Sequence, residues 1–166
     1  MISQEKNYAF IDAQNLNLGI QFLGWKVNYR RFRVYLREKY AVTKAYMFIG
    51  FLPENQNLYR VLQDDGFVLI FKPVLKNKDG SAKGNVDADL VLRAMIDFLD
   101  YDKAVIVTSD GDFYCLVDYL RDMSKLKTVI SPYYQTCSFL LRKSARGSIV
   151  FLDNLKQKLQ YIKNTA

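Results

Sequence analysis

Residues 104–122 read AVIVTSDGDFYCLVDYLRD: an apolar β-branched run, an acidic turn and an amphipathic segment in immediate succession. An unbroken apolar run is typical of a strand that is buried on both faces of a sheet. The segment after the turn has the spacing of a helix that packs on one face. We therefore predict a strand over Ala104 to Thr108 and a helix over Asp112 to Asp122, the repeating unit of a parallel α/β sheet.

The same alternation runs along the whole chain, with apolar runs such as YAFI, AYMFIGF, FVLIF and SIVFL. The other predicted strands are Tyr8 to Asp12, Lys44 to Phe51, Phe67 to Lys72, Lys127 to Ile130 and Ile149 to Leu152. The other predicted helices are Tyr29 to Tyr40, Asn55 to Asp64, Val86 to Leu99, Thr136 to Lys143 and Asn154 to Lys163. Helices on both faces of a mainly parallel sheet make a three-layer α/β/α sandwich of the Rossmannoid kind.

The length of 166 residues and the absence of repeats or low-complexity tracts favour one domain over residues 1–166. One segment, Lys76 to Asn85 (KNKDGSAKGN), is polar and basic and contains glycine. A loop of this length inside a compact domain is often a binding loop or a lid.

The composition excludes several classes of function. With no histidine and two cysteines, the chain has no Ser-His-Asp or Cys-His triad and no thiolate or imidazole zinc site. We expect both thiols, Cys115 and Cys137, to be buried in a reducing cytoplasm. No secretory or membrane-spanning segment is evident, so we expect a soluble cytoplasmic protein with no membrane partner. The net charge of +7 favours a polyanionic partner such as nucleic acid, although it also suits a protein that is merely soluble.

Carboxylates follow two of the predicted strands and begin one of the predicted helices. Asp12 ends the first strand, Asp110 and Asp112 follow the strand at 104–108, and Asp87 and Asp89 lie at the start of the helix before it. In open α/β sheets the ligand crevice lies beyond the carboxyl ends of the strands, so these acids can converge there. Clustered carboxylates need a cation, and Mg²⁺ or Mn²⁺ suits them. Alternatively, each acid taken singly caps a helix or starts a turn.

The segments FIDAQN, KGNVDADL and VTSDGDFYCLVDYL resemble the NYN domain (LabA-like) family, a branch of the PIN-like nuclease superfamily. The resemblance covers essentially the whole chain in the right order, and its most specific element is SDGDF. It implies a PIN-like fold and a Mg²⁺- or Mn²⁺-dependent ribonuclease that hydrolyses RNA phosphodiester bonds.

Carried over to this chain, the resemblance implies an acidic metal site with polar neighbours. The metal-binding acids would be Asp12, Asp87, Asp110 and Asp112, with Asp89 as a further candidate, and the neighbours would be Asn15, Ser109 and Lys83. Many members of the family carry another acid about six residues after the Asp87 position, where this chain has Arg93. This departure leaves open a second interpretation, a catalytically weak or inactive PIN-like domain that binds RNA or protein.

Basic residues provide two candidate RNA-binding elements. Arg30, Arg33 and Arg37 have helical spacing and form one stripe, with Tyr29 or Trp25 nearby to stack on an unpaired base. Lys76, Lys78 and Lys83 lie in the polar loop that leads into the Asp87 helix. In each case the alternative is an ordinary solvated surface. The sequence is also compatible with a homodimer.

Overall fold

The computed structural model describes residues 5–76, 82–83 and 86–163, and it describes residues 75–76 and 82–83 by their backbone alone. Six strands form one sheet in the order β3-β2-β1-β6-β7-β8, and every pairing in it is parallel. The strands are β1 (Asn7–Asp12), β2 (Val42–Phe51), β3 (Phe67–Pro73), β6 (Ala104–Val107), β7 (Leu126–Ser131) and β8 (Ile149–Phe151). The predicted parallel sheet and its six strands are confirmed to within two residues at their ends.

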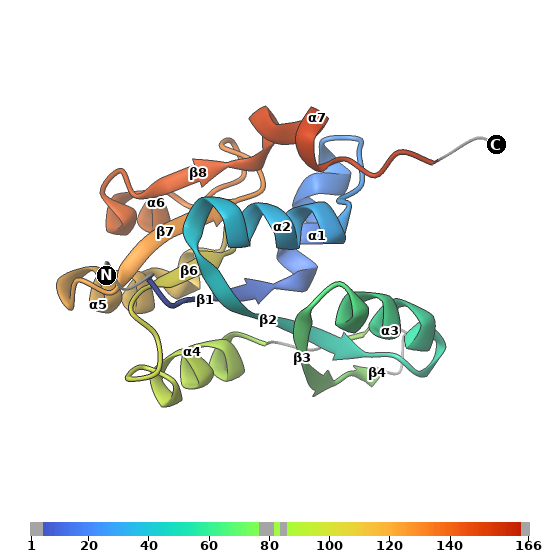
Figure 1. Ribbon diagram of the computed structural model, residues 1–166, viewed down its shortest axis with the longest axis horizontal. Helices are drawn as coiled ribbons and strands as arrows, with labels where there is room; N and C mark the ends of the chain where they lie inside the picture. Colours follow the sequence, from blue (N-terminus) through green and yellow to red (C-terminus); the bar gives the residue numbers. More distant parts are fainter. Residues whose placement is uncertain (1–4, 77–81, 84–85, 164–166) are drawn as a thin grey trace.

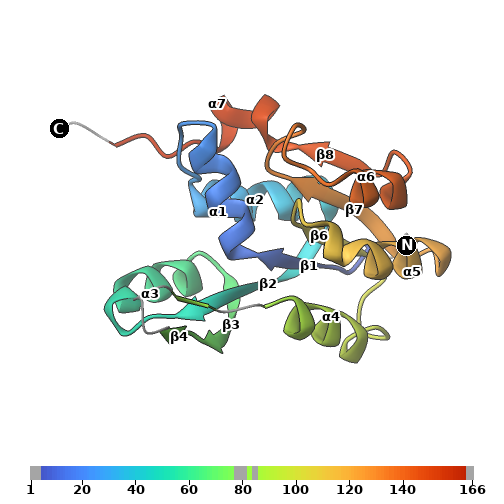
Figure 2. The ribbon, with the colours of Figure 1, turned by 180° about the vertical axis from the view of Figure 1, so that it is seen from behind.

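Helices cover both faces of this sheet (Figures 1 and 2). One layer contains α1 (Ala13–Phe22), α2 (Tyr29–Tyr40), α3 (Gln56–Asp64) and α7 (Lys156–Leu159). The other contains α4 (Asp87–Ile96), α5 (Tyr114–Asp122) and α6 (Phe139–Ala145). Short 3-10 turns lie at Pro53–Asn55 (η1), Gly111–Phe113 (η2) and Leu152–Leu155 (η3). The three-layer α/β/α architecture is therefore confirmed.

Alternate residues of the buried strands feed two separate cores. In β1, Ala9 and Ile11 pack against the layer of α1 and α2, whereas Tyr8 and Phe10 pack against the layer of α4 and α5. All four side chains are at most 3% exposed. A strand that is apolar on both faces can only lie in the middle of such a sandwich, which explains the unbroken apolar runs in the sequence.

The strand order places a topological switch point between β1 and β6. The chain winds from β1 through β2 to β3 on one side and from β6 through β7 to β8 on the other. At such a point the connections after the two central strands diverge and leave a crevice at their carboxyl ends. The segments FIDAQN and VTSDGDF both end at this crevice.

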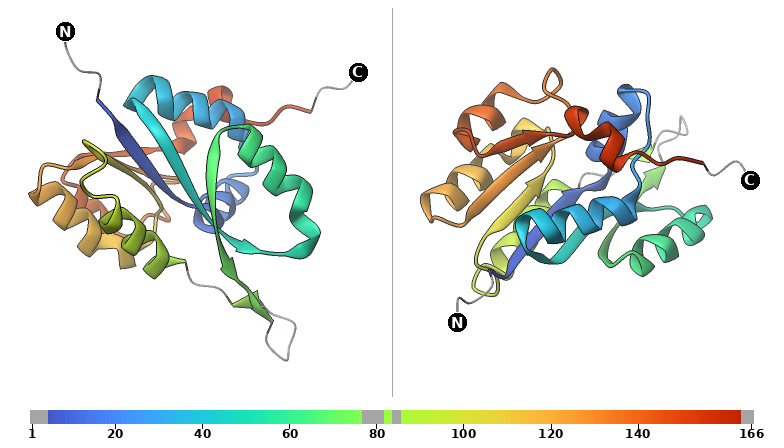
Figure 3. Two further views of the ribbon diagram at one scale, coloured as in Figure 1. Left: turned by 60° about the horizontal axis from the view of Figure 1, so that its bottom comes forward. Right: turned by 45° about the horizontal axis from the view of Figure 1, so that its top comes forward.

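The other predicted helices match the structure to within three residues at their ends, and three parts of the chain differ more. Helix α1 was not predicted, since its sequence AQNLNLGIQF contains two asparagines and a glycine, which are weak helix formers; Asp12 caps it and Leu16 and Ile20 bury one face. The last helix ends at Leu159 rather than Lys163, because Gln160 becomes extended and bridges Val27. Within the predicted loop, β4 (Leu75–Lys76) and β5 (Ala82–Lys83) form a small antiparallel pair. Figure 3 shows β4 projecting beyond the end of β3.

The cysteines and the membrane prediction can be compared with the structure as well. Cys137 is buried, but Cys115 is exposed, so the expectation of two buried thiols is wrong for Cys115. It lies on the outer side of α5, whose buried face is formed by Leu116, Val117 and Leu120. Among the described residues, no helix combines the length and apolar character that crossing a membrane requires.

Candidate active site

Three acids meet at the carboxyl edge of the sheet, beside the switch point. Asp87 begins α4, and Asp110 and Asp112 lie in the turn between β6 and α5. Each has a carboxylate oxygen within 4.8 Å of an oxygen of the other two. Asp87 and Asp110 are partly buried and Asp112 is exposed, so the group opens to solvent on one side.

Asp12 lies at the end of β1 and faces the same crevice. Its carboxylate caps α1, accepting a hydrogen bond from the backbone N–H of Asn15 at 3.2 Å, and it accepts a second from the Thr108 hydroxyl at 3.4 Å. The pKa of Asp12 is raised from 3.8 to about 6, chiefly by burial and also by the negative charges of Asp87 and Asp110, against the opposing hydrogen bonds from Asn15 and Thr108. Asp12 therefore feels the charge of the acid group, although it is not one of the three with mutually close oxygens.

Polar side chains brace the two loops that carry these acids. The amide oxygen of Asn15 accepts hydrogen bonds from the Ser109 N–H at 2.8 Å and from the Ser109 hydroxyl at 2.9 Å. The Asp110 carboxylate accepts one from the Asp112 N–H at 2.9 Å and so caps the η2 turn. The capping alternative is thus correct for Asp12 and Asp110, and Asp110 both caps a turn and belongs to the three-acid group.

Thr108 is a site residue that the sequence analysis did not single out. Its hydroxyl donates to Asp12 and accepts from the Asp110 N–H at 3.2 Å. It therefore links the acid at the end of β1 to the acid that follows β6. The signal in the sequence was its position, directly before the SDGD segment and at the end of an apolar strand.

The donor set fits a hard divalent cation. Magnesium binds carboxylate oxygens at about 2.0–2.1 Å, so two ligands of one ion lie at most about 4.2 Å apart. Oxygens that all lie within 4.8 Å of one another are close enough to share one ion, directly or through water. Carboxylates without thiolate or imidazole ligands favour Mg²⁺ or Mn²⁺ over softer metals.

The remaining acids of α4 have other partners. Asp89 forms an ion pair with Lys72 at 3.4 Å and is not part of the three-acid group. Arg93, which replaces the further acid of the family pattern, pairs with Asp97 at 3.5 Å. Asp97 is buried and accepts a hydrogen bond from the Tyr46 hydroxyl at 2.5 Å. Asp97 is therefore part of the packing beneath α4.

The predicted arginine stripe lies away from the acids. Arg33 donates to the carbonyls of Val42 and Thr43, which open β2, and to that of Gly66 before β3. Arg30 pairs with Asp65 at 2.9 Å, and the exposed Arg37 lies 3.9 Å from Glu38. These contacts place the stripe toward the amino edge of β2 and β3, opposite the acid group. Of the aromatic residues proposed for stacking, Trp25 is only 7% exposed.

The predicted lysines of the polar loop are described only in part. Lys78 lies outside the described residues, and Lys76 and Lys83 are described by their backbone in β4 and β5. Lys72 is a basic residue near the site that was not predicted from the sequence. It ends a predicted apolar strand and does not belong to a run of basic residues.

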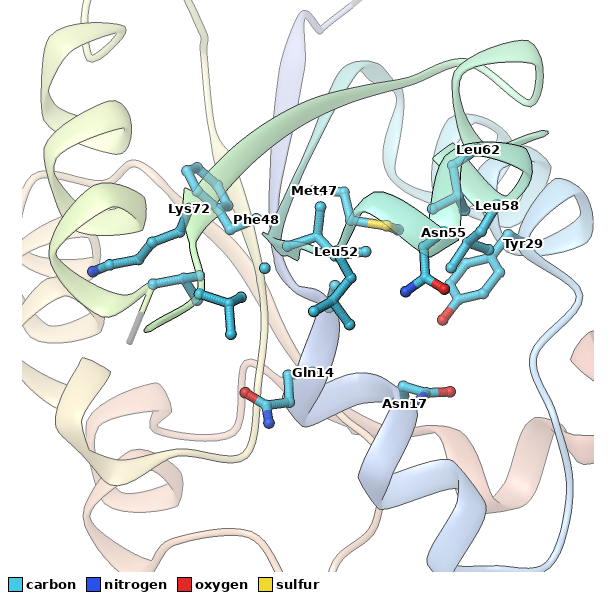
Figure 4. A pocket seen from close by; sticks show the side chains of 15 residues that line it. Gln14, Asn17, Tyr29, Met47, Phe48, Leu52, Asn55, Leu58, Leu62 and Lys72 are labelled. Carbon is cyan, nitrogen blue, oxygen red and sulfur yellow. The ribbon is translucent and has the colours of Figure 1, made fainter. Parts of the chain in front are cut away.

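A pocket of about 350 Å³ adjoins the acid group (Figure 4). Its walls come from the start of α1, the carboxyl ends of β2 and β3, and α3. Figure 4 shows Tyr29, Asn55 and Leu58 at one end, Lys72 at the other, and Gln14 and Asn17 across from the strands. No sequence motif marks this pocket, because its lining residues are scattered from Ala13 to Val86.

Comparisons with known proteins agree with this architecture. A curated relative, the low amplitude and bright protein LabA of Synechococcus elongatus, is 28% identical over 132 residues, which span 74% of this chain and 71% of LabA. A crystal structure of a Vibrio parahaemolyticus protein of unknown function superposes with a TM-score of 0.81 at 25% identity, covering 97% of this chain and 99% of that one. The family model for the NYN domain matches residues 7–152. This chain therefore belongs to the NYN domain family.

Proposed function

We propose that this protein is a metal-dependent ribonuclease that hydrolyses RNA phosphodiester bonds at the acid group of Asp87, Asp110 and Asp112. The observation that carries the proposal is the convergence of their oxygens within 4.8 Å at the switch point of the sheet. Membership of a family in the PIN-like nuclease superfamily supports the same reaction class. The overall charge of +7 suits a polyanionic substrate.

The three acids would hold a Mg²⁺ or Mn²⁺ ion, with Asp12, which feels the charges of Asp87 and Asp110, as a fourth carboxylate nearby. A bound divalent ion supplies Lewis-acid polarisation of a phosphate oxygen and lowers the pKa of a water molecule. Thr108 and the N–H of Asn15 fix the carboxylate of Asp12. Asn15 and Ser109 hold the two loops in register, and from this position they can orient the attacking water.

No covalent intermediate is required of the protein. The chain has no histidine, so a general base of that type is excluded. Cys115, although exposed, therefore has no imidazole partner to activate it as a nucleophile. Water-mediated hydrolysis at a carboxylate site needs neither group.

The experiment is cleavage of single-stranded and double-stranded RNA by the purified protein with Mn²⁺, with Mg²⁺ and with EDTA. Asp12→Asn and Asp112→Asn are measured beside Asp100→Asn, which changes an exposed acid just after α4. We expect cleavage that EDTA, Asp12→Asn and Asp112→Asn abolish and that Asp100→Asn leaves unchanged.

Two results would contradict the proposal. Cleavage that survives both site substitutions would belong to a contaminant. An absence of cleavage with RNA binding retained would instead support the alternative of a domain that binds RNA without cutting it.

A further inference from the structure

The pocket beside the acid group has an apolar floor and a polar rim. Its floor and walls include Met47, Phe48, Leu52, Leu58 and Leu62, and its volume of about 350 Å³ lies in the range of about 300–1,000 Å³ that is usual for small-molecule sites. Polar groups stand on opposite sides: Gln14 and Asn17 on α1, and Asn55 and Tyr29 across from them (Figure 4).

The residues that line the pocket include direct chain neighbours of two of the acids. Ala13, which lines it, directly follows Asp12, and Val86, which also lines it, directly precedes Asp87. Lys72 lines one end and forms an ion pair with Asp89, two residues beyond Asp87. A ligand whose one part lies in the pocket can therefore place its other part at the acids.

The lining specifies the chemistry of that ligand. Lys72 is the one charged residue among the described residues that line the pocket. The other polar groups are neutral side-chain amides, each with a donor and an acceptor, and a phenolic hydroxyl. A phosphate has little to pair with in such a pocket except at the lysine. A flat, neutral ring with donors and acceptors on its edge fits the apolar floor and the amide rim.

We propose that this pocket binds an unstacked nucleobase of single-stranded RNA whose phosphate lies at the acid group. The inference rests on the proposed function and deepens it by naming the substrate class. A base must leave its stack to enter, and bases in single strands and loops do so readily whereas those in an A-form duplex do not. Lys72 lines the same pocket and pairs with Asp89 near the start of α4, so it can contact a phosphate that connects the base to the acids.

The test is RNA affinity without cleavage, measured in the Asp112→Asn background with Mg²⁺. Leu58→Trp fills the pocket from its 41% exposed wall on α3, and Leu92→Trp makes the same change at a 59% exposed site on α4 that does not line the pocket. The probes are fluorescein-labelled short oligomers of A, C and U, the same strands with one abasic nucleotide at each successive position, and a duplex RNA. Fluorescence anisotropy gives the affinities.

We expect one abasic position to weaken binding by about tenfold, with little effect at the other positions. Leu58→Trp should weaken binding of the intact strand by a similar factor and remove the difference between intact and abasic strands. Leu92→Trp should retain the affinity for the intact strand and the difference between intact and abasic strands. Equal abasic penalties in the Leu58→Trp and Leu92→Trp variants, or duplex binding as tight as single-strand binding, would overturn the inference.

Free nucleoside monophosphates form a further arm, because a base can also enter as part of a free nucleotide. Monophosphates that bind as tightly as the strands would overturn the assignment to RNA. The two proposals fail separately: metal-dependent cleavage without a position-specific abasic effect removes the base pocket alone, whereas a pocket-dependent abasic effect without cleavage removes the nuclease alone. Absence of any RNA binding overturns both.

Discussion

The amide oxygen of Asn15 accepts two hydrogen bonds from Ser109, one from its backbone N–H at 2.8 Å and one from its hydroxyl at 2.9 Å. The two residues are 94 positions apart in the sequence. Asn15 lies in the first turn of α1, three residues after Asp12, and Ser109 directly precedes Asp110. The pair therefore sets the distance between the first acid of the site and the last two.

This relationship predicts unequal effects for its two partners. Asn15→Ala removes the oxygen that accepts both hydrogen bonds and leaves the part-buried Ser109 N–H without its partner, so we expect a loss of about 1–3 kcal/mol in the free energy of unfolding. Ser109→Ala keeps the backbone bond and should cost about 1 kcal/mol or less. The double variant should be about as stable as Asn15→Ala, because both changes break the same contact. Urea denaturation measures all three, and additive losses would contradict a shared contact.

The cleavage rates of these variants should fall in the same order as their stabilities. If Asn15 acts by holding the loops, Asn15→Ala should lower the cleavage rate more than Ser109→Ala does. The affinity for Mn²⁺ should fall in parallel, since the acids then lose their fixed spacing. A large rate loss in Ser109→Ala with unchanged Mn²⁺ affinity would instead indicate that the serine hydroxyl contacts the substrate or the attacking water.

The buried carboxyl of Asp12 predicts a pH-dependent stability in EDTA. Its pKa is raised from 3.8 to about 6, mainly by burial, so between these values the folded protein binds more protons than the unfolded chain. The free energy of unfolding should therefore fall as pH rises from about 4 to about 6, by up to about 3 kcal/mol from this group. Below about pH 4 the carboxyl of Asp12 is protonated in the folded and in the unfolded chain, so this loss of stability does not occur there.

Asp12→Asn is the matched control, because the amide keeps the shape of the protonated acid. The difference in stability between the two proteins should change across this pH window and then level off at higher pH. Adding Mg²⁺ at neutral pH should stabilise the native protein more than the variant, since the cation favours the charged carboxylate. A difference that is constant with pH would mean that Asp12 titrates as an ordinary exposed acid.

The sheet could be predicted from sequence because both faces of its strands are buried. Runs such as AVIVT are apolar throughout only when helices cover the two sides, and the acids at their ends mark the carboxyl edge. Helix α1 was missed because Asn15, Asn17 and Gly19 interrupt its good helix formers; tertiary burial of Leu16 and Ile20 and the cap from Asp12 stabilise it nonetheless. The end of α7 was misplaced because a contact with Val27 ends it.

The convergence of three acids could be predicted from the sequence, whereas the pocket beside them could not. Asp87, Asp110 and Asp112 lie within a few residues of strand ends or helix starts, so topology alone brings them together. The pocket is formed by residues from α1, β2, α3 and β3, whose proximity depends on packing that no local pattern records. The spacing of Arg30, Arg33 and Arg37 correctly predicted that they lie on one helix. Spacing does not indicate, however, which edge of the sheet that helix face adjoins.

Gly111, between the two acids of the η2 turn, predicts a steric requirement. A Cβ at this position would lie 2.4 Å from the hydroxyl oxygen of Ser138 and 3.0 Å from its Cβ. We expect Gly111→Ala to lower the free energy of unfolding by about 1–3 kcal/mol, as overpacking does, and to weaken Mn²⁺ binding because the turn that carries Asp110 and Asp112 must shift.

The second-site variant Ser138→Gly distinguishes a clash from a general effect of alanine. In the Ser138→Gly background the colliding atoms are gone, so adding Gly111→Ala should cost little in thermal or urea denaturation, and Mn²⁺ affinity should return. An equal cost in both backgrounds would show that the backbone of Gly111 itself requires glycine.

The basic residues give a last prediction, which separates structural from RNA-binding roles. Arg33 satisfies three backbone carbonyls at the amino edge of the sheet, so Arg33→Ala should destabilise the fold by about 2 kcal/mol or more. Arg37 lies on the same helix with its side chain 64% exposed, and Arg37→Ala should change stability little.

Because Arg33 and Arg37 both lie away from the acids, we expect Arg37→Ala to leave RNA affinity unchanged. Lys72→Ala should lower RNA affinity and reduce the dependence of log affinity on log salt by about one phosphate contact. Titrations of single-stranded RNA at several salt concentrations measure both quantities. If Arg37→Ala reduced the salt dependence and Lys72→Ala did not, the RNA would follow the arginine stripe, and the path from the pocket to the acids would be wrong.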